Sequence, residues 1–311
     1  MEQIMLSGWG YQAVICPPRG ANLISLCKVE WQAGSLRTPE GEEEFRSTPF
    51  FWGTPLLFPP NRISGGCFSF EGRSYSFPIP QEGRREFLHG ELHRLPFQVM
   101  EKGETLARLR YEAGEENPYL TFPHSFCAEM TYSLTEKGLF QTLSVTNLSR
   151  ENMPIGIGYH TTFGLPLVRG GEEGEVSLYL DAEEEILRDA NYLPTGEFRR
   201  DTPLLEELNR GTLVPSLQPL SVHLKMGKSR QMRLTDRKNG IQVVYQPGEA
   251  FGFWTLFNGG HRDFVCVEPQ SWMTNSPNAP FPREESGFSF LRPGEKRDYT
   301  TFFAIEKATD L

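Results

Sequence analysis

The stretch SFCAEMTYSLTEKGLFQTLSVTNLS, residues 125–149, decides the fold class. In its first half the apolar side chains recur at every second position: Phe126, Ala128, Met130, Tyr132 and Leu134. A period of two is typical of a β-strand with one buried face. After TEKG the alternation resumes, and two such runs joined by a glycine-containing turn predict a β-hairpin.

Strand-like runs continue along the chain, whereas helical signals are sparse. We expect further strands in ARLRYE (107–112), QVVYQP (242–247), GFWTLFN (252–258) and RDYTTFFAIE (297–306). The segment DTPLLEELNRG (201–211) predicts one short helix, with Pro203 in its first turn and Gly211 just past its end. The acidic run DAEEEILRD (181–189) could form a second helix, and we interpret it as a solvated face rather than a site.

These patterns predict an all-β protein, a large antiparallel β-sandwich with few short helices. Many short strands, each with one buried face, need a second sheet to cover that face. We see no linker and no clear repeat, so residues 1–311 are expected to form a single domain.

Composition excludes some classes of protein. The formal net charge of −9 argues against a nucleic-acid surface, which needs clustered Lys and Arg. The five cysteines are scattered without a CxxC pair, which favours reduced packing thiols in a cytoplasmic protein. No run reaches the ~18 apolar residues that a membrane span needs. We therefore expect neither a nucleic-acid nor a membrane partner, and the oligomeric state stays open.

The run DFVCVEPQSWMTN, residues 263–275, places a carboxylate at the end of a buried strand. Phe264 to Val267 read as strand, and Pro269 is expected to end it because proline cannot donate to a ladder. Glu268 would then emerge at the rim of a cleft.

We single out two of the six histidines, His89 in FLHG and His160 in GYHTTF, because glycine in such segments allows a ligand to approach closely. His89 and His93 have the i,i+4 spacing of a zinc pair on a helix, but Gly90 and Pro96 argue against a helix there. We predict no metal.

Arginine and tryptophan side chains near these segments have two interpretations each. Arg62, in LLFPPNRISGG, offers a planar fork of donors for hydroxyls or carboxylates, or a structural ion pair. Trp52, Trp254 and Trp272 can stack on a sugar ring or simply fill the core.

Taken in order, these motifs resemble the aldose 1-epimerase (galactose mutarotase) family. The resemblance runs in family order from about residue 50 to 305 and rests on five segments. These are LLFPPNRISGGCFSFEGRSYSFP followed by FLHG, GYHTTF, LPTGEF (193–198), CVEPQSWMTNSPNAPFP (266–282), and LRPGE (291–295) with a final strand.

The resemblance implies a β-supersandwich without cofactor or metal, acting on a small-molecule sugar. By motif, Glu268 is the expected general base and His160 the general acid. His89 and Arg62 would position the sugar and stabilise charge on its ring oxygen. Asn61, Gln270 and Trp272 are further candidates for binding substrate.

One segment departs from the family pattern. Members often carry an aspartate that contacts sugar hydroxyls, but LQPLSVHLKMG (217–227) has Ser221 and His223 and no Asp. This departure concerns substrate identity and not the acid–base pair.

The residues leave alternatives open. A phosphorylated hexose would need extra cations, which Arg84 and Arg85 in GRREF could supply. A sugar-binding protein without activity is the other alternative. A glycosidase would need two flanking carboxylates, and only Glu268 is well placed.

Overall fold

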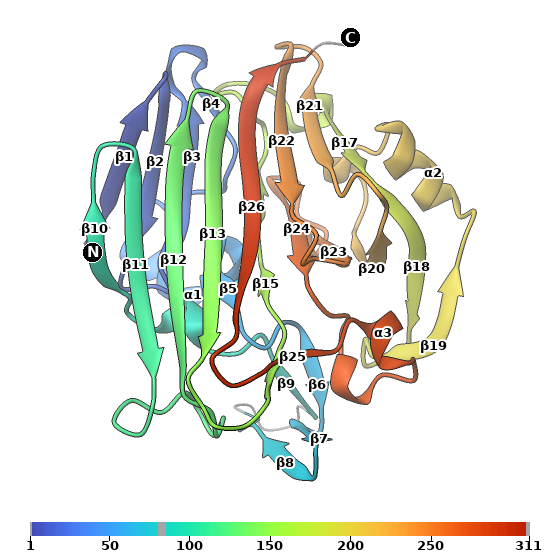
Figure 1. Cartoon of the computed structure of the whole chain (residues 1–311). Helices are drawn as coiled ribbons and strands as arrows, with labels where there is room; N and C mark the ends of the chain where they lie inside the picture. Colours follow the sequence, from blue (N-terminus) through green and yellow to red (C-terminus); the bar gives the residue numbers. More distant parts are fainter. Residues whose placement is uncertain (1, 80–84, 309–311) are drawn as a thin grey trace.

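The computed structural model describes residues 2–79 and 85–308 (Figure 1). Its longest strands form an eight-stranded antiparallel sheet. In spatial order this sheet contains β10 (Gln98–Lys102), β11 (Leu106–Ala113), β12 (Phe126–Thr135), β13 (Gly138–Asn147), β26 (Lys296–Lys307), β22 (Ile241–Pro247), β21 (Met232–Asp236) and β17 (Val176–Leu180). The predicted hairpin is confirmed as β12–β13, in which Phe126 is paired with Asn147 and Thr135 with Gly138.

A second eight-stranded sheet carries the motifs from the C-terminal part of the chain. Its order is β19 (Pro194–Arg199), β18 (Ala182–Arg188), β20 (Ser221–Met226), β23 (Phe253–Phe257), β24 (Phe264–Gln270), β15 (Gly158–Tyr159) and β5 (Leu56–Leu57), with β16 (Thr162–Gly164) also beside β24. In Figure 1 strands β23, β24 and β15 lie behind the first sheet.

The two large sheets pack face to face, which confirms the predicted β-sandwich. Tyr245 of β22 contacts Trp254 of β23 with ring centroids 6.3 Å apart, and its hydroxyl lies 3.0 Å from Thr161 Oγ1. Trp254 is fully buried. Aromatic rings bury 150–250 Å² each, so such contacts between the inner faces stabilise the pairing of the sheets.

Smaller elements surround this sandwich. A four-stranded sheet contains β1 (Ile4–Gly8), β2 (Tyr11–Cys16), β3 (Asn22–Lys28) and β4 (Ala33–Gly34). Three two-stranded pieces are β6 (Arg62–Ser64) with β9 (Glu86–Leu88), β7 (Cys67–Phe70) with β8 (Arg73–Ser76), and β14 (Met153–Ile155) with β25 (Ser289–Leu291). The α-helices are α1 (Glu42–Ser47), α2 (Pro203–Arg210) and α3 (Arg283–Ser286), and the 3₁₀ turns near the site are η2 (Pro49–Phe51) and η3 (Leu92–Arg94).

The predicted short helix is confirmed as α2. The Thr202 hydroxyl accepts from the backbone N–H of Leu205, Pro203 occupies the first turn, and Gly211 ends the helix at φ 70°. The threonine caps a free N–H group of the first turn, the proline needs no N–H partner there, and the glycine adopts the left-handed conformation that ends a helix.

The suggestion that residues 181–189 form a helix is wrong, and one carboxylate of the run is not solvated. This run forms strand β18, and Glu184 within it is buried, paired with Lys225 Nζ at 3.4 Å and with Arg200. The sequence pattern places Glu184 in solvent. In the folded chain its carboxylate can be buried because Arg200 and Lys225 neutralise it.

The prediction that Pro269 ends its strand is also wrong. Strand β24 continues to Gln270, and Pro269 pairs with Trp254. On the side away from β23, the N–H groups of Val267 and Ser271 donate to Thr161 and Ile157. Pro269 lies between them, where the neighbouring chain is interrupted between β15 and β16. Proline is tolerated because no regular ladder bond is needed at that break.

Candidate active site

Glu268 and His160 form a buried carboxylate–imidazole pair. Glu268 lies within β24, and His160 lies in the break between β15 and β16. His160 Nε2 is 3.3 Å from Glu268 Oε1, and both side chains are almost completely buried. His160 Nδ1 has no hydrogen-bond partner among the described residues. A buried polar atom without a partner is uncommon and often marks a functional site.

A network of amides and hydroxyls holds the second oxygen of Glu268. Gln270 Nε2 donates to Glu268 Oε2 at 3.2 Å and lies 3.1 Å from Thr255 Oγ1. Asn61 Nδ2 donates to Gln270 Oε1 at 3.3 Å and to Thr255 Oγ1 at 3.2 Å. The predicted residues Asn61 and Gln270 therefore lie beside Glu268, although more than 200 residues separate the first two in sequence.

His223 occupies the region where the family pattern led us to look for an aspartate. Its Nδ1 lies 3.1 Å from Thr255 Oγ1, and its Nε2 accepts from the backbone N–H of Thr274 at 3.1 Å. Thr255 pairs with both His223 and Glu268 across adjacent strands. The sheet register thus places the imidazole of His223 two strands away from the carboxylate of Glu268. No sequence pattern singled out Thr255, since a threonine in a strand is unremarkable.

His89 lies beside the Glu268–His160 pair and has a strained backbone conformation. Its φ is 65°, and Asn61 also has a positive φ of 59°. His89 Nδ1 accepts from the Asn61 backbone N–H at 3.3 Å, and the His89 and His160 rings pack edge to face with centroids 5.3 Å apart. Left-handed backbone at non-glycine residues clusters at functional sites. Gly90 is required next to it, because a Cβ there would lie 1.9 Å from the Phe58 carbonyl oxygen.

The ring of Phe50, in η2, covers the histidines. Its centroid lies 4.9 Å from His89, 4.4 Å from His93 and 5.6 Å from His160. His93 lies in η3, where its Nε2 accepts from Arg94 Nε at 3.0 Å, so His89 and His93 do not share a helix face. This geometry removes the spacing argument for a zinc pair.

Arg62 and Arg188 lie near enough to Glu268 to act on its carboxylate. The charge of each lowers the pKa of Glu268. Arg62 begins β6 and Arg188 ends β18, and both guanidinium groups lie over the ring of Tyr192. The sequence indicated Arg62 but missed Arg188 and Tyr192. Arg188 stands at the end of the acidic run whose strand character was not predicted.

Burial sets the protonation of the central pair. It raises the pKa of Glu268 to about 8, against the opposing effects of the Gln270 hydrogen bond and of Arg62 and Arg188. It lowers the pKa of His160 to about 4. Both shifts favour uncharged forms in a desolvated site. Between these two values the pair holds one proton, which lies on Glu268.

Trp272 lies deeper than the expected pocket wall. Its indole N–H donates to the Pro60 carbonyl at 3.4 Å, its ring stacks on Phe288 with centroids 5.9 Å apart, and it is buried. It supports the segment that carries Asn61 and Arg62. Contact between Trp272 and a substrate stays a prediction.

One group of side chains has metal-ligand atoms close together. Ligand atoms of His160, Cys266 and Glu268 all lie within 4.8 Å of one another. The Cys266 thiol lies 3.3 Å from Thr162 Oγ1, and burial raises its pKa well above the ordinary value. A metal bound here would have to displace the thiol proton, because the thiolate is the form that binds a metal.

The remaining cysteines are free thiols, as the sequence predicted. Cys16 and Cys127 are buried and Cys27 is half-buried, but Cys67 is exposed and is therefore not a packing thiol.

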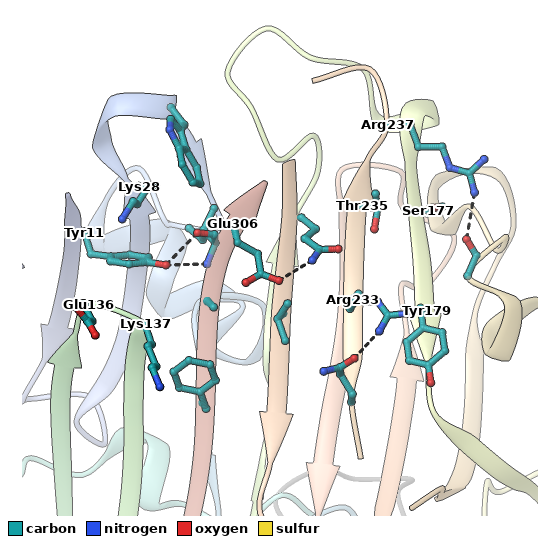
Figure 2. A pocket seen from close by; sticks show the side chains of 18 of the residues that line it. Tyr11, Lys28, Glu136, Lys137, Ser177, Tyr179, Arg233, Thr235, Arg237 and Glu306 are labelled. Carbon is teal, nitrogen blue, oxygen red and sulfur yellow. Dashed lines mark hydrogen bonds between the residues drawn. The ribbon is translucent and has the colours of Figure 1, made fainter. Parts of the chain in front are cut away.

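A hollow lies elsewhere on the molecule, on the face of the first sheet that turns away from the core (Figure 2). Its volume is about 800 Å³. Cationic and aromatic side chains line it, among them Lys28, Lys137, Arg233 and Tyr179. None of the predicted site residues, all of which are described, borders this hollow. The candidate active site therefore rests on the Glu268–His160 chemistry and not on cavity size.

Comparison with known proteins places the chain in a family with this architecture. The family model described as Aldose 1-epimerase matches residues 3–304, so the chain belongs to the aldose 1-epimerase family. Galactose mutarotase from Rattus norvegicus is 27% identical over 306 residues, covering 86% of this chain and 82% of the relative. The plasmid protein LacX from Lactococcus lactis subsp. lactis is 28% identical, covering 79% and 83% of the two chains.

A solved structure shares the whole fold. A galactose mutarotase-like protein from Clostridium acetobutylicum superposes with a TM-score of 0.93 at 30% identity, covering 97% of this chain and 94% of that one. The all-β, galactose mutarotase-like sandwich is thereby confirmed. Among the described residues, none of the helices has the length and apolar character needed to cross a membrane.

Proposed function

We propose that the protein is an aldose 1-epimerase that interconverts the α and β anomers of a hexose, with the hydroxyl pattern of galactose or glucose. The observation that carries this proposal is the buried Glu268–His160 pair, with 3.3 Å between its nearest atoms. Anomer exchange moves one proton away from the C1 hydroxyl and another onto the ring oxygen. Two adjacent acid–base groups that share one proton match this requirement.

In the proposed mechanism Glu268 accepts the proton of the C1 hydroxyl while His160 donates a proton to the ring oxygen. The C1–O5 bond breaks and a free aldehyde forms. Rotation about C1–C2 presents the other face of the aldehyde, and ring closure reverses both transfers. The pair holds one proton before and after the cycle, so protons balance.

The proton must lie on His160 when the reaction starts in this direction. In the empty site burial favours the proton on Glu268, whereas the positive charges of Arg62 and Arg188 favour its ionised form. A bound sugar that donates hydrogen bonds to the carboxylate would add to that effect. His89 and Arg62 are proposed to hold the ring oxygen and stabilise its developing charge.

Supporting side chains are proposed to keep the base in place. Gln270 orients one carboxylate oxygen of Glu268 and leaves the other toward His160. Asn61 in turn orients Gln270. Such a preorganised network costs no reorganisation at the moment of reaction.

Polarimetry of freshly dissolved α-galactose and α-glucose tests the proposal. The purified protein should speed the decay of optical rotation above the spontaneous rate. Glu268→Gln should reduce this rate by about 10²–10⁴-fold, the usual effect of losing one general base. Glu112→Gln, at an exposed position of β11, serves as a matched control.

The outcomes separate the candidate functions. Full activity in Glu268→Gln would overturn the assignment of the base. Sugar binding without any rate enhancement, in the wild type, would favour a sugar-binding protein instead.

A further inference from the structure

The hydroxyl of Thr255 is surrounded by hydrogen-bond donors beside Glu268. Its Oγ1 lies 3.2 Å from Asn61 Nδ2, 3.1 Å from Gln270 Nε2 and 3.1 Å from His223 Nδ1. Thr255 belongs to β23 and is paired with Glu268 of β24. Side chains paired in this way leave the same face of an antiparallel sheet, with Cβ atoms about 4.5–5.5 Å apart. The direction of each hydrogen bond at Thr255 therefore decides what this face offers to a ligand next to Glu268.

The two amides both donate to Thr255, because their other hydrogen bonds fix their orientation. Asn61 Oδ1 accepts from the backbone N–H of Arg62 at 3.0 Å, so its amide nitrogen is the atom that faces Thr255. Gln270 Oε1 accepts from Asn61 Nδ2 at 3.3 Å, so Gln270 also presents its nitrogen to Thr255. An amide nitrogen donates and cannot accept. Neither amide can therefore receive the proton of the Thr255 hydroxyl.

His223 cannot receive that proton either. Its Nε2 accepts from the backbone N–H of Thr274 at 3.1 Å and is therefore unprotonated. Burial, and to a smaller extent the charge of Arg188, lower the pKa of His223 to about 3, so the ring is neutral at neutral pH. A neutral imidazole carries one proton, which then lies on Nδ1. His223 Nδ1 is thus a third donor to the Thr255 oxygen.

The Thr255 proton has no acceptor among the described residues. Three N–H groups compete for the two lone pairs of this oxygen, and in none of these hydrogen bonds does the Thr255 side chain donate. A buried donor without an acceptor is costly, and water or a ligand often completes it. Thr255 is 8% exposed, against 3% for Asn61, 2% for Glu268 and 0% for Gln270 and His223. Thr255 is thus the member of this group with the largest exposed fraction, and a ligand that contacts its hydroxyl must supply an acceptor.

The position of Thr255 relative to the acid–base pair indicates which ligand atom accepts. Glu268 Oε1 faces His160, whereas Oε2 accepts from Gln270, whose amide nitrogen also contacts Thr255. Thr255 therefore lies on the Oε2 side of the carboxylate and His160 on the Oε1 side. In the proposed mechanism Glu268 meets the C1 hydroxyl and His160 the ring oxygen. The other neighbour of C1 in the ring is C2, so the C2 hydroxyl falls on the side of Thr255.

We propose that the Thr255 hydroxyl donates a hydrogen bond to the C2 oxygen of the bound aldose and so selects sugars with a hydroxyl at C2. This inference rests on the proposed function and adds a specificity-determining residue to it. Glucose and galactose share this hydroxyl. His223 acts as a positioning residue, because a carboxylate in its place would accept the threonine proton, whereas its N–H leaves that proton for the sugar. A site built to bind a substrate hydroxyl rejects the analogue that lacks it, because a polar group of the site is then unpaired.

The direct test combines Thr255→Val with deoxy sugars. Two-dimensional exchange NMR gives kcat/KM for anomer exchange of glucose, 2-deoxyglucose and 3-deoxyglucose, each corrected for its spontaneous rate. Thr255→Val should lower the ratio of kcat/KM for glucose to that for 2-deoxyglucose about five- to tenfold, and leave the ratio of glucose to 3-deoxyglucose within about twofold. Valine also leaves the two amides without their acceptor and can disturb Glu268, but that loss is common to all three sugars and cancels in each ratio.

Two variants and one spectrum serve as controls. Thr255→Ser keeps the hydroxyl and should keep the glucose to 2-deoxyglucose ratio of the wild type. Thr131→Val makes the valine change at a half-buried position of β12, in the other large sheet, and should change neither rates nor ratios. Long-range proton–nitrogen correlation NMR of histidine-labelled protein should show the His223 proton on Nδ1, with His223→Gln to assign the signals.

The outcomes distinguish this inference from the proposed function. An unchanged glucose to 2-deoxyglucose ratio in Thr255→Val, an equal change for 3-deoxyglucose, or a His223 proton on Nε2 would each overturn the Thr255 contact and leave the epimerase in place. Exchange of none of the sugars by the wild type would overturn the proposed function. Calorimetric titration with glucose and 2-deoxyglucose then tests the contact alone. Tighter binding of glucose that Thr255→Val removes supports it, whereas equal binding or no binding refutes it.

Discussion

His160 and Glu268 approach each other to 3.3 Å from two neighbouring segments of one sheet, and both are almost completely buried. Burial shifts their pKa values in opposite directions, to about 4 and about 8. Over the interval between these values the pair holds a single proton. A carboxylate and an imidazole arranged in this way can give and take protons without a net change of charge.

The first prediction concerns the pH dependence of anomer exchange. The active state contains one proton on the Glu268–His160 pair. Above pH about 8 that proton is lost from Glu268, and below about 4 a second is gained by His160. We expect kcat/KM to form a plateau between these limits and to fall tenfold per pH unit above the upper one. The two limits belong to the pair as a whole.

Stopped-flow polarimetry between pH 5 and 10 measures this profile, with circular dichroism to verify folding. A loss of activity on acidification that begins near pH 6.5 in still-folded protein would contradict it. That result would mean that His160 titrates at its ordinary value.

The second prediction links Glu268 to stability. Its pKa in the folded protein, about 8, is above the ordinary value of 4.5, so the folded state binds more protons than the unfolded state over this range. The free energy of unfolding therefore falls as pH rises from 4.5 to 8, by up to ~1.4 kcal/mol for each unit of pKa difference. The glutamine side chain of Glu268→Gln does not titrate, so the free energy of unfolding of this variant does not fall in this way.

Thermal unfolding should show the difference. We expect equal Tm values for Glu268→Gln and wild type near pH 4.5, and a Tm several degrees higher for the variant at pH 9. A Tm difference that does not change with pH would refute the raised pKa. If Glu268 is the proposed base, its acidic side chain is kept at the expense of stability.

The third prediction concerns Gln270 as a positioning residue. Its amide donates to Glu268 Oε2, and that hydrogen bond lowers the pKa of Glu268. In Gln270→Leu the pKa of Glu268 should rise further, so the alkaline limb of the pH profile moves to higher pH. We expect kcat to fall about tenfold, because losing a hydrogen bond to a charged group weakens the orientation of the base.

The exposed Gln218→Leu provides the matched control. A lower rate with an unshifted alkaline limb would mean that Gln270 acts on packing alone and not on the carboxylate.

The fourth prediction concerns metal ions. The proposed mechanism uses side chains alone, and the Cys266 thiol near Glu268 is protonated and hydrogen-bonded to Thr162. Prolonged treatment with EDTA should leave kcat unchanged. A loss of activity that zinc restores would instead identify His160, Cys266 and Glu268 as metal ligands, and Cys266→Ser would then abolish the restoration.

Much of the fold followed from local patterns. The alternation in residues 125–149 predicts the β12–β13 hairpin because burial of one face imposes a period of two, and the cap residues around Pro203 predict α2 because helix ends have few solutions. The order of short motifs identified Glu268, His160, His89 and Arg62 as a group. The expectation of a single domain over residues 1–311 stays a prediction.

By itself the sequence determined the fold class, the family and the acid–base candidates. Tertiary structure alone decided that Pro269 continues its strand beside an interrupted neighbour, since that depends on where β15 and β16 separate. It also decided that Arg188 lies near Glu268 in the candidate site. The run 181–189 looks solvated because the partners of Glu184 lie far along the chain, and only the order β18-β20-β23-β24 brings Arg188 to Glu268. Charge pairing and strand order are long-range properties, and no local pattern encodes them.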